Sequence, residues 1–442
     1  MNLEVLNDIN NLQPINTDVL LIPILQDHNK HRKENNLSFV YVYDISNKKE
    51  YILNVLHHDY PQSLNGTKIK EKLLGKIYIF NKSYLFNTFP DSLDINLFHW
   101  ITTNEPMEVQ YTKEISVYHN WYRDINNCNN IIPMMNWLTY CRNIKAQCIS
   151  IINNTTESPE YDFYNEMLLN NLYRIENSGL ATNPNLTKKY INKEKIDRLY
   201  CQYNMFTSTG RPSNHFNSIN FAALNKRTGI RSMIIPRTDN GYLIEFDYDS
   251  MHVRLTADLI KHDLPGGNLH EYFGRYYFKT PVLEEEMYEK SKSLTWHLLY
   301  GNISNHYQEI PFFKSVLEYR KQLWSKFKKD GFVEMPISGR KIMRSNFGDN
   351  MTQNVLFNYL LQGHETEYNS LMLHDIFKYL YKRDSKLILY TYDSFLFDYN
   401  INDGPTFVKD IENILNQKNM KTTIKYGKNY HQMKKLQHNE YC

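Results

Sequence analysis

The sequence predicts a multidomain protein of the α/β and α+β classes, and three observations support that prediction. The chain has 442 residues, which is enough for two or three domains with sizeable cores. Short β-branched and aromatic runs alternate with stretches of helical apolar spacing along the chain. A polar stretch with little structural signal, Ser150–Asp162, lies at the end of the N-terminal 155 residues and is the best linker candidate.

Composition narrows the class of partner. The chain carries 51 Lys+Arg and 48 Asp+Glu, a net charge of +3, so any grip on nucleic acid must come from local basic patches. No apolar run is long enough to span a bilayer, and the first residues lack a signal-peptide pattern. The cysteines have neither zinc-ligand nor disulfide spacing: Cys128, Cys141, Cys148, Cys201 and Cys442. We therefore expect free thiols in a soluble cytoplasmic protein with no membrane partner, made in a host cytoplasm if a phage or plasmid encodes it.

The elements expected in the N-terminal 155 residues are strands followed by a helix. Strands are predicted over Val19–Leu25, Ser38–Ile45, Glu50–Leu56 and Lys76–Phe80, and a helix over Asn130–Ile144. After the polar stretch, the spacing of apolar residues predicts a helix over Phe163–Leu180, with Gly179 as its C-terminal cap. A short basic helical stretch follows, and strands and helices alternate from residue 204 to the end.

The segment Gly241–Leu259 is the first candidate for chemistry. Its composition predicts a strand over Tyr242–Phe246 and a helix over Met251–Leu259, with Asp247 between them. A carboxylate at the end of a buried strand is costly unless it is paired, hydrogen-bonded or bound to a metal. Many such aspartates only cap the next helix, so this segment alone leaves both interpretations open.

A second aspartate, Asp393, lies between two short strands in Leu387–Tyr399, at the turn formed by residues 392–394. Two aspartates on adjacent strand ends could hold two divalent ions, and Mg²⁺ favours such oxygen ligands. The commoner role of a turn aspartate is to stabilise its own turn. Spacing alone does not decide between these alternatives.

The helix expected over Tyr288–Gly301 carries a stripe with one member in every four residues: Tyr288, Lys292, Trp296 and Tyr300. A lysine one turn before an exposed aromatic residue can hold a triphosphate while the ring stacks on its base. Aromatic stripes more often belong to a core, but the interposed lysine argues against full burial. His270 could add a phosphate donor, although a lone histidine is more often structural.

Two further segments carry polar groups suited to nucleic acid. In Thr207–Asn220, Gly210 permits a turn, and Arg211, Asn217 and Asn220 are types that contact phosphate, sugar and minor-groove acceptors. A plain surface loop is the alternative. In the helix predicted to begin near Asn358, Gln362 can contact a base edge, although a glutamine on a helix surface is usually just solvated.

Taken in order, these segments resemble the polymerase half of family A DNA polymerases over about residues 163–435. TGRPS…N…IN resembles the family's TGRLSS…PNLQNIP, FDYDSMHVR its motif A (DYSQIELR), KSLTWHLLYG its motif B (KAINFGIIYG) and TYDSFLF its motif C (VHDEIVF). SGRKIMR, NYLLQG and KYGKNYHQM are similar to its GRRRYLP, NAPIQG and VGxNW segments. Each motif is loose, but seven in the right order form a specific signal.

The resemblance implies a right-hand polymerase that adds dNTPs to the 3′-OH of a primer-template DNA. Palm and fingers would occupy 204–442, with the fingers at about 256–345, and a much reduced thumb would occupy 163–203. Asp247, Asp393 and the backbone carbonyl of Tyr248 would hold two Mg²⁺ ions, or Mn²⁺ in their place. Lys292 would neutralise the incoming triphosphate beside these metals.

Further roles follow from position in the same motifs. The residues implied in nucleotide binding, besides Lys292, are His252, His270, Tyr288, Trp296 and Tyr300. Those implied in DNA binding are Arg211, Asn217, Asn220, Arg254, Gln362 and Tyr392. A short thumb implies weak duplex grip and low processivity without a partner such as a processivity factor, helicase or primase.

The sequence also departs from the family pattern. His252 replaces the motif A glutamate that excludes a ribose 2′-OH, which puts sugar discrimination in doubt, and His297 replaces a motif B glycine. Tyr288 replaces an arginine, with Lys290 as a candidate substitute, and Ser394 replaces a motif C carboxylate. Both metal aspartates and the lysine are retained, which favours an active enzyme.

Family members often carry a 3′–5′ exonuclease domain upstream, of the RNase H-like class, and residues 1–155 have a suitable length and strand order. The run VLLIPIL contains no carboxylate, however, and KIYIFNKSYLF has Asn81 and Ser83 but no aspartate. A two-metal nuclease needs acidic ligands. We therefore expect a degenerate, inactive domain that serves as a platform for duplex or a partner protein.

Two rival functions remain. The replacement at His252 leaves open a single-subunit RNA polymerase or a primase-like enzyme, which would incorporate rNTPs or start without a primer. A catalytically silent nucleic-acid-binding scaffold in a replisome would bind template without Mg²⁺-dependent extension, and the retained aspartates make it the less favoured option.

Overall fold

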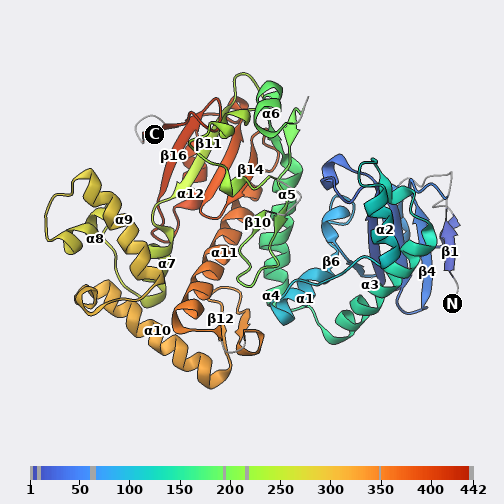
Figure 1. Cartoon of the computed structure of the whole chain (residues 1–442), viewed down its shortest axis with the longest axis horizontal. Coiled ribbons are helices and arrows are strands. Elements are labelled where there is room, and N and C mark those ends of the chain that lie inside the picture. Colours follow the sequence, from blue (N-terminus) through green and yellow to red (C-terminus); the bar gives the residue numbers. More distant parts are fainter. Residues whose placement is uncertain are drawn as a thin grey trace. The chain divides into compact units, whose positions relative to one another are not determined.

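The computed structural model describes residues 3–6, 11–59, 66–192, 196–214, 219–347 and 350–437 (Figure 1). The chain forms two compact units: a first unit of residues 1–177, 200–206 and 214–220, and a second unit of residues 178–199, 207–213 and 221–442. The linker expected over Ser150–Asp162 is instead largely helical, and the first unit continues past it. The polar side chains there cap helices: Ser158 Oγ accepts a hydrogen bond from Tyr161 N at 3.2 Å.

The first unit is built on a mixed sheet. Its described strands are β1 (Leu3–Leu6), β2 (Val19–Leu25), β3 (Leu37–Asp44), β4 (Lys49–Asn54), β5 (Ile77–Ile79) and β6 (Leu93–Asp94), in the spatial order β1-β4-β3-β2-β5-β6. Strands β2, β3 and β4 form an antiparallel meander. Strand β5 runs parallel to β2, β6 runs parallel to β5, and β1 runs parallel to β4.

Both faces of this sheet are covered, and that explains why β2 is a continuous apolar run. Leu20 and Ile22 face one core together with Trp137, whereas Val19 and Leu21 face a second core. The helices of the unit are α1 (Ile95–Thr103), α2 (Lys113–Trp121), α3 (Met134–Asn154) and α4 (Pro159–Asp162). The strand positions predicted from the sequence are confirmed to within a few residues.

The stretch predicted as a reduced thumb, 163–203, is divided between the two units. A π-helix (Phe163–Leu169) continues into α5 (Asn170–Ser178), and Gly179 follows with a φ of 62°, as expected of a C-terminal cap. Then come β7 (Leu180–Ala181), α6 (Pro184–Ile191), β8 (Arg198–Leu199) and β9 (Tyr203–Asn204). The described part of this stretch contains no long helical pair, and the thumb itself stays a prediction.

The second unit is organised around an antiparallel sheet with β11 (Tyr242–Tyr248) at its centre. The order is β14 (Lys386–Thr391), β15 (Ser394–Tyr399), β11, β16 (Thr422–Gly427) and β17 (Lys434–Lys435). On one face, Phe246 packs against Phe397 and Tyr248 packs against Tyr368 of α11 (Gln353–Tyr379). Because side chains alternate along a strand, Glu245 and Asp247 point to the opposite face.

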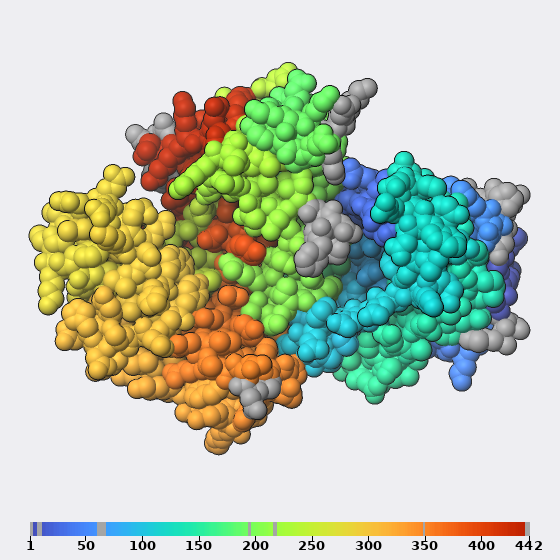
Figure 2. Space-filling view, in the orientation of Figure 1, coloured from blue at the N-terminus to red at the C-terminus, as the bar shows by residue number. Residues whose placement is uncertain are grey.

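Helices fill most of residues 251–330: α7 (Met251–Ile260), α8 (Leu269–Phe278), α9 (Glu285–Tyr300) and α10 (Pro311–Asp330). A hairpin of β12 (Phe332–Glu334) and β13 (Lys341–Met343) follows. Phe327, Val333 and Leu356 form part of the core that joins α10 and this hairpin to α11. Figure 2 shows the second unit hollowed between the yellow helices α8 and α9 and the red strands. The remaining α-helix and strand of the described residues are α12 (Phe407–Leu415), which packs on β15, and the short β10 (Ser213–Asn214).

No helix in the described ranges combines the length and the apolar character needed to cross a membrane. The longest, α11, is buried over much of its length but carries His, Glu and Asn side chains in that buried part.

Candidate active site

Asp247, on β11, and Asp393, in the turn just before β15, lie next to each other. Asp247 stands opposite Ser394 in the β11–β15 pairing, and Tyr248 N donates to Asp393 O at 3.0 Å. Burial, followed by the charge of Asp247, raises the pKa of Asp393 to about 6. Burial and then the charge of Glu245 raise the pKa of Asp247, against the opposing charges of nearby lysines. Such mutual destabilisation of carboxylates is relieved by a bound cation.

The turn that carries Asp393 is tight and fixed from two sides. Thr391 pairs with Ser394, which leaves Tyr392 and Asp393 as a two-residue loop. Tyr392 has a φ of 61°, an unfavourable conformation for a residue with a Cβ. The guanidinium of Arg211 lies 3.8 Å from the Tyr392 ring centroid, and Asn369 Nδ2 donates to Tyr392 O at 2.7 Å. These contacts hold the strained residue and so fix the position of Asp393.

A third carboxylate, Glu245, shares the face of β11 with Asp247 and was not singled out from the sequence. Tyr430 Oη donates to Glu245 at 2.9 Å, and Ser394 Oγ lies 3.4 Å from the same carboxylate oxygen. Lys425 Nζ is 3.5 Å from Glu245 and 3.9 Å from Asp247. The spacing of two residues on a strand was the available signal. The site thus contains a carboxylate beside the serine that departs from motif C.

Helix α9 presents a cation and two stacked rings to the same site. Lys292 is exposed, and its charge acts on both Asp247 and His270. The Trp296 and Tyr300 rings stack with centroids 5.7 Å apart and an interplanar angle of 9°. Both rings are partly exposed, so the stripe on this helix is not closed core. A surface of this kind can accept a planar base beside a charged phosphate.

His252, on α7, is the centre of a buried network. Its Nδ1 bonds the hydroxyl of Tyr300, and its Nε2 lies 3.2 Å from Glu365 Oε2. Arg211 Nε lies 2.9 Å from the same Glu365 oxygen, and its NH2 is 3.2 Å from Oε1. Burial pushes the pKa of Glu365 upward, but the charges of His252 and Arg211 outweigh it and hold the pKa below its ordinary value. Glu365 was not predicted from the sequence.

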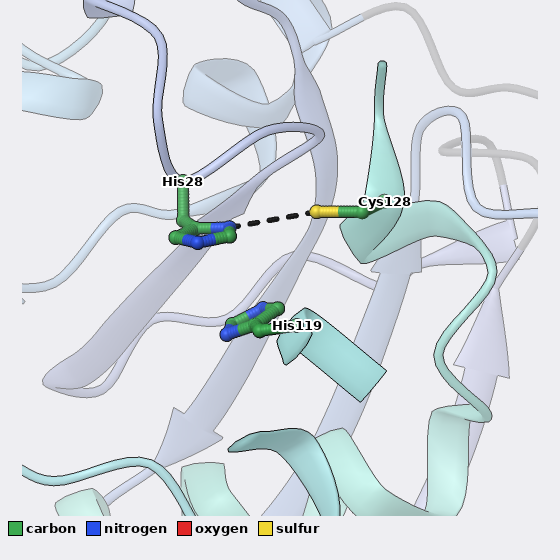
Figure 3. Close-up of side chains that lie close together, drawn as sticks. All are labelled: His28, His119 and Cys128. Carbon is green, nitrogen blue, oxygen red and sulfur yellow. Dashed lines mark hydrogen bonds between the residues drawn. The ribbon is translucent and has the colours of Figure 1, made fainter. Parts of the chain in front are cut away.

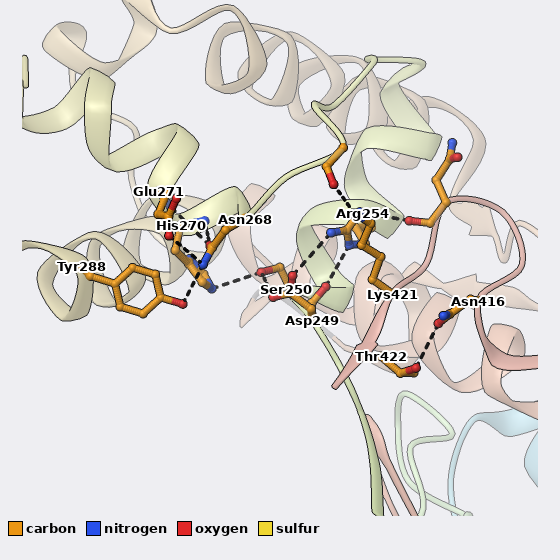
Figure 4. A network of polar contacts seen from close by, with 12 residues as sticks. Asp249, Ser250, Arg254, Asn268, His270, Glu271, Tyr288, Asn416, Lys421 and Thr422 are labelled. Atoms are coloured by element: carbon orange, nitrogen blue, oxygen red, sulfur yellow. Dashed lines mark hydrogen bonds and ion pairs between the residues drawn. The ribbon is translucent and has the colours of Figure 1, made fainter. Parts of the chain in front are cut away.

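His270 and Tyr288 take part in a hydrogen-bond network at the start of α8 (Figure 4). His270 Nε2 lies 3.1 Å from Ser250 Oγ, and Asn268 Nδ2 donates to Tyr288 Oη at 3.3 Å. His270 is buried, and this burial lowers its pKa. The contacts tie α8 to the turn after β11, and the predicted roles of both residues toward a nucleotide stay predictions.

Arg254 is buried and has a structural role in this arrangement. Its Nε donates to Asp249 O at 2.9 Å and its NH1 donates to Asn419 O at 3.0 Å, as part of the network in Figure 4. These bonds hold the turn after β11 against the loop before β16. The DNA-binding role expected of Arg254 from the motif stays a prediction.

The other residues expected to bind DNA are spread over different settings. Gln362 is partly buried on α11, next to Gly363, where an added Cβ would lie 2.4 Å from Met335 Cε. Asn220 is exposed in the first unit, and Asn217 lies outside the described residues. Tyr248, whose backbone carbonyl was expected to help hold a metal, follows Asp247 on β11, and its hydroxyl donates to Leu415 O at 3.1 Å; its role toward a metal stays a prediction.

Comparisons with known proteins bear on the fold. No protein-family model matches the chain, and no curated protein sequence is similar to it. The structure is similar to that of the POL domain of Pol1 from M. smegmatis in complex with DNA primer-template and dNTP. The TM-score is 0.70 and the sequence identity 11%, over 97% of this chain and 99% of that chain. The chain therefore has the mixed α/β, multidomain fold of a DNA polymerase domain.

Proposed function

We propose that this chain is a template-directed DNA polymerase that adds dNTPs to the 3′-OH of a primer. The observation that supports this most directly is that Asp393, in the turn before β15, lies beside Asp247 at the end of β11, where the charge of Lys292 on α9 also acts. A fold similar to a domain solved with primer-template and dNTP supports the same assignment.

The residues present fit divalent metal ions of the Mg²⁺ type. Asp247 and Asp393 are oxygen ligands, and each has a raised pKa because burial and a neighbouring carboxylate disfavour its charge. Together with the carbonyl of Tyr248, they would hold two ions, Mg²⁺ or Mn²⁺. Such ions would activate the attacking oxygen and stabilise the leaving oxygen.

The chain's own side chains would position the nucleotide. Lys292, exposed on α9, would pair with the triphosphate, and the stacked rings of Trp296 and Tyr300 would lie against its sugar and base. Arg211 and Tyr392 would contact the primer end from the minor-groove side. Reactions of this kind depend chiefly on positioning and charge stabilisation, which suits a site with few reactive side chains.

The choice between deoxyribose and ribose depends on the residue that lies beside the nucleotide sugar. His252 stands where the family resemblance leads us to expect glutamate, and it is fixed by Tyr300 and Glu365. A fixed imidazole at this position would still occupy space next to the nucleotide sugar, so we favour dNTPs. A single-subunit RNA polymerase or primase-like enzyme is the alternative, and comparing dNTP with rNTP incorporation on a primed template separates the two.

For the first unit we propose an RNase H-like domain without 3′–5′ exonuclease activity. An antiparallel meander followed by two parallel strands supports the fold. Asp27, just after β2, accepts from Asn29 N at 2.9 Å, and Asp94, at the end of β6, caps α1 through Asn96 N at 2.8 Å. The carboxylates at these strand ends thus serve turn and cap hydrogen bonds, which supports an inactive platform for duplex or a partner.

The setting we propose is phage or plasmid replication in a host cytoplasm. The reduced thumb would leave little sequence-independent grip on duplex, because that grip depends on many phosphate contacts. We therefore expect short extension products from the isolated protein and longer ones in the presence of a replication partner.

Primer extension with Mg²⁺ tests the proposal. Wild type should extend a primed template with dNTPs, and Asp247→Ala should not, because a ligand for the metal ions is lost. Asp239→Ala is the matched control, since Asp239 is exposed in the turn just before β11. Equal extension by Asp247→Ala and wild type would end the proposal, and template binding without any extension would favour the scaffold function.

A further inference from the structure

Three side chains of the kinds that bind transition metals come together in the first unit (Figure 3). His28 lies in the loop after β2, His119 lies on α2, and Cys128 begins a short 3-10 helix, Cys128–Asn130. One candidate ligand atom from each lies within 4.8 Å of the other two. Their spacing in the sequence gave no signal, because three separate segments supply them.

One edge of this cluster already has the length that a tetrahedral metal site needs. His28 Nδ1 lies 3.5 Å from Cys128 Sγ. With metal–sulfur and metal–nitrogen distances of about 2.3 and 2.0–2.1 Å, the sulfur–nitrogen edge of a zinc tetrahedron is about 3.6 Å. An ion could therefore sit between these two atoms with little movement of either side chain.

His119 is held in the tautomer that a ligand requires. Asn129 Nδ2 donates to Leu25 O at 2.8 Å, which leaves Asn129 Oδ1 as an acceptor. His119 Nε2 lies 2.8 Å from that oxygen and so carries the proton, and its Nδ1 has a free lone pair. A metal-binding histidine almost always donates its other ring N–H in this way.

Burial, followed by the charge of Asp27, raises the pKa of the Cys128 thiol, while the backbone N–H groups of His28 and Asn129 act in the opposite direction. A coordinated Zn²⁺ displaces the thiol proton, so the ion itself would supply the charge that stabilises the thiolate. Cys128 is 1% exposed, so its thiol is poorly placed to act as a nucleophile on a large substrate. His28 is partly exposed and offers an entry path for an ion.

For all three side chains to bind one ion, the imidazole ring of His119 must move. The His28 and His119 rings stack with centroids 3.8 Å apart and an interplanar angle of 20°. An ion must lie in the plane of each imidazole it binds, so His119 must tilt for its Nδ1 to meet an ion held by the other two. The ring of Tyr111, whose centroid lies 4.7 Å from that of His119, must make room for this tilt.

We infer that His28, His119 and Cys128 form a zinc site with a fourth position open to water. Two imidazoles and a thiolate are the ligands that Zn²⁺ selects over Mg²⁺, which distinguishes this site from the pair of aspartates in the second unit. The ion would tie the loop after β2, α2 and the 3-10 helix to one another. Asn129 is its positioning residue.

The test uses the full chain, stripped with a chelator and dialysed. Zinc content, measured by mass spectrometry after a Zn²⁺ soak and desalting, should reach one equivalent in wild type. The affinity for Zn²⁺ should be at least about 100-fold lower in Cys128→Ala than in wild type. Asn129→Leu should lose affinity about 10–100-fold, as expected when a ligand's hydrogen-bond partner is removed. Cys148→Ala, a buried cysteine on α3 outside the cluster, should bind like wild type.

Cobalt gives a second measurement that does not depend on any variant folding. Wild type titrated with Co²⁺ should develop a thiolate-to-cobalt absorption band and tetrahedral visible bands, and Zn²⁺ should displace both. Absence of the thiolate band in wild type, or equal zinc affinity in wild type and a folded Cys128→Ala, would overturn the inference. Primer extension is not part of the readout, so this result and the fate of the polymerase proposal are independent.

Discussion

Replacing Asp393 with asparagine should stabilise the metal-free protein while it abolishes extension. Asp393 is partly buried, and this burial, followed by the charges of Asp247 and Glu365, raises the pKa of Asp393 to about 6. Near pH 8 the carboxylate must nevertheless be ionised, and without a cation this charge weakens the folded state. Asparagine has nearly the same shape and carries no charge. The substitution therefore separates the cost of the charge from the packing of the side chain.

The size of the expected gain in stability follows from the pKa of Asp393. A rise from 3.8 to about 6 is roughly two pH units, or about 3 kcal/mol at 1.36 kcal/mol per unit. Asparagine loses some hydrogen bonds, so we expect a gain of about 1–3 kcal/mol in the free energy of unfolding. The sign is set by proton binding: between about pH 4 and 6 the folded state holds more protons than the unfolded state. Wild-type stability therefore falls as the pH rises through this window, and the advantage of Asp393→Asn opens there.

The assay is urea unfolding of the full chain, followed by near-UV circular dichroism in EDTA at about pH 4 and about pH 8. The gap between variant and wild type should be present at the higher pH and close at the lower one. Adding Mg²⁺ should stabilise wild type and not the variant. Asp403→Asn is the control, because hydrogen bonds from Ser385 and Asp384 outweigh burial and lower the pKa of Asp403. That substitution should reduce stability at the higher pH. A variant at Asp393 that is less stable than wild type near pH 8, or a gap unchanged near pH 4, would refute the reasoning.

Three further predictions concern other parts of the chain. Lys292→Ala should raise the KM for dNTPs about 10–100-fold with unchanged stability, because a charged hydrogen bond to the triphosphate is lost. Lys409→Ala, an exposed lysine on α12, should leave the KM unchanged; equal KM values for wild type and Lys292→Ala would exclude the assigned role. Glu365→Gln should lower the free energy of unfolding by about 3 kcal/mol, since it removes the charge of a buried carboxylate that pairs with Arg211 and contacts His252, and a double-mutant cycle with His252→Gln should give a coupling clearly different from zero. A primer with a labelled, mismatched 3′ end should stay intact with wild type and Mg²⁺ in the absence of dNTPs, and shortening of the label would show that the first unit is active.

Much of the fold could be predicted because local patterns agree with the tertiary structure. Strand β2 coincides with the predicted Val19–Leu25, and the β14–β15 hairpin has its turn at Asp393 as expected. The linker prediction was wrong for a physical reason. Serine, threonine and asparagine favour helix caps as much as loops, and at Ser158 the cap joins two helices rather than two domains.

The candidate site was only partly predictable, because its missing members depend on how elements pack. Glu365 lies on α11, which is buried on more than one side, so its apolar spacing does not indicate which residues face α7. His28, His119 and Cys128 meet only once the sheet and α2 are assembled. Distances between such segments are fixed by tertiary structure and leave no period in the sequence.

The two departures that weigh most against an active enzyme are each matched by a carboxylate from another element. Ser394 stands where the resemblance to motif C leads us to expect an acid, and Glu245 of β11 lies 3.4 Å from its hydroxyl. His252 stands where the resemblance to motif A leads us to expect an acid, and Glu365 of α11 lies 3.2 Å from its Nε2. The negative charge around Asp247 and Asp393 is therefore retained although its positions in the sequence have changed. Because a bound cation responds to the surrounding electric field rather than to the segment that supplies each charge, these carboxylates fit the proposed metal site although their positions in the sequence differ from the motifs.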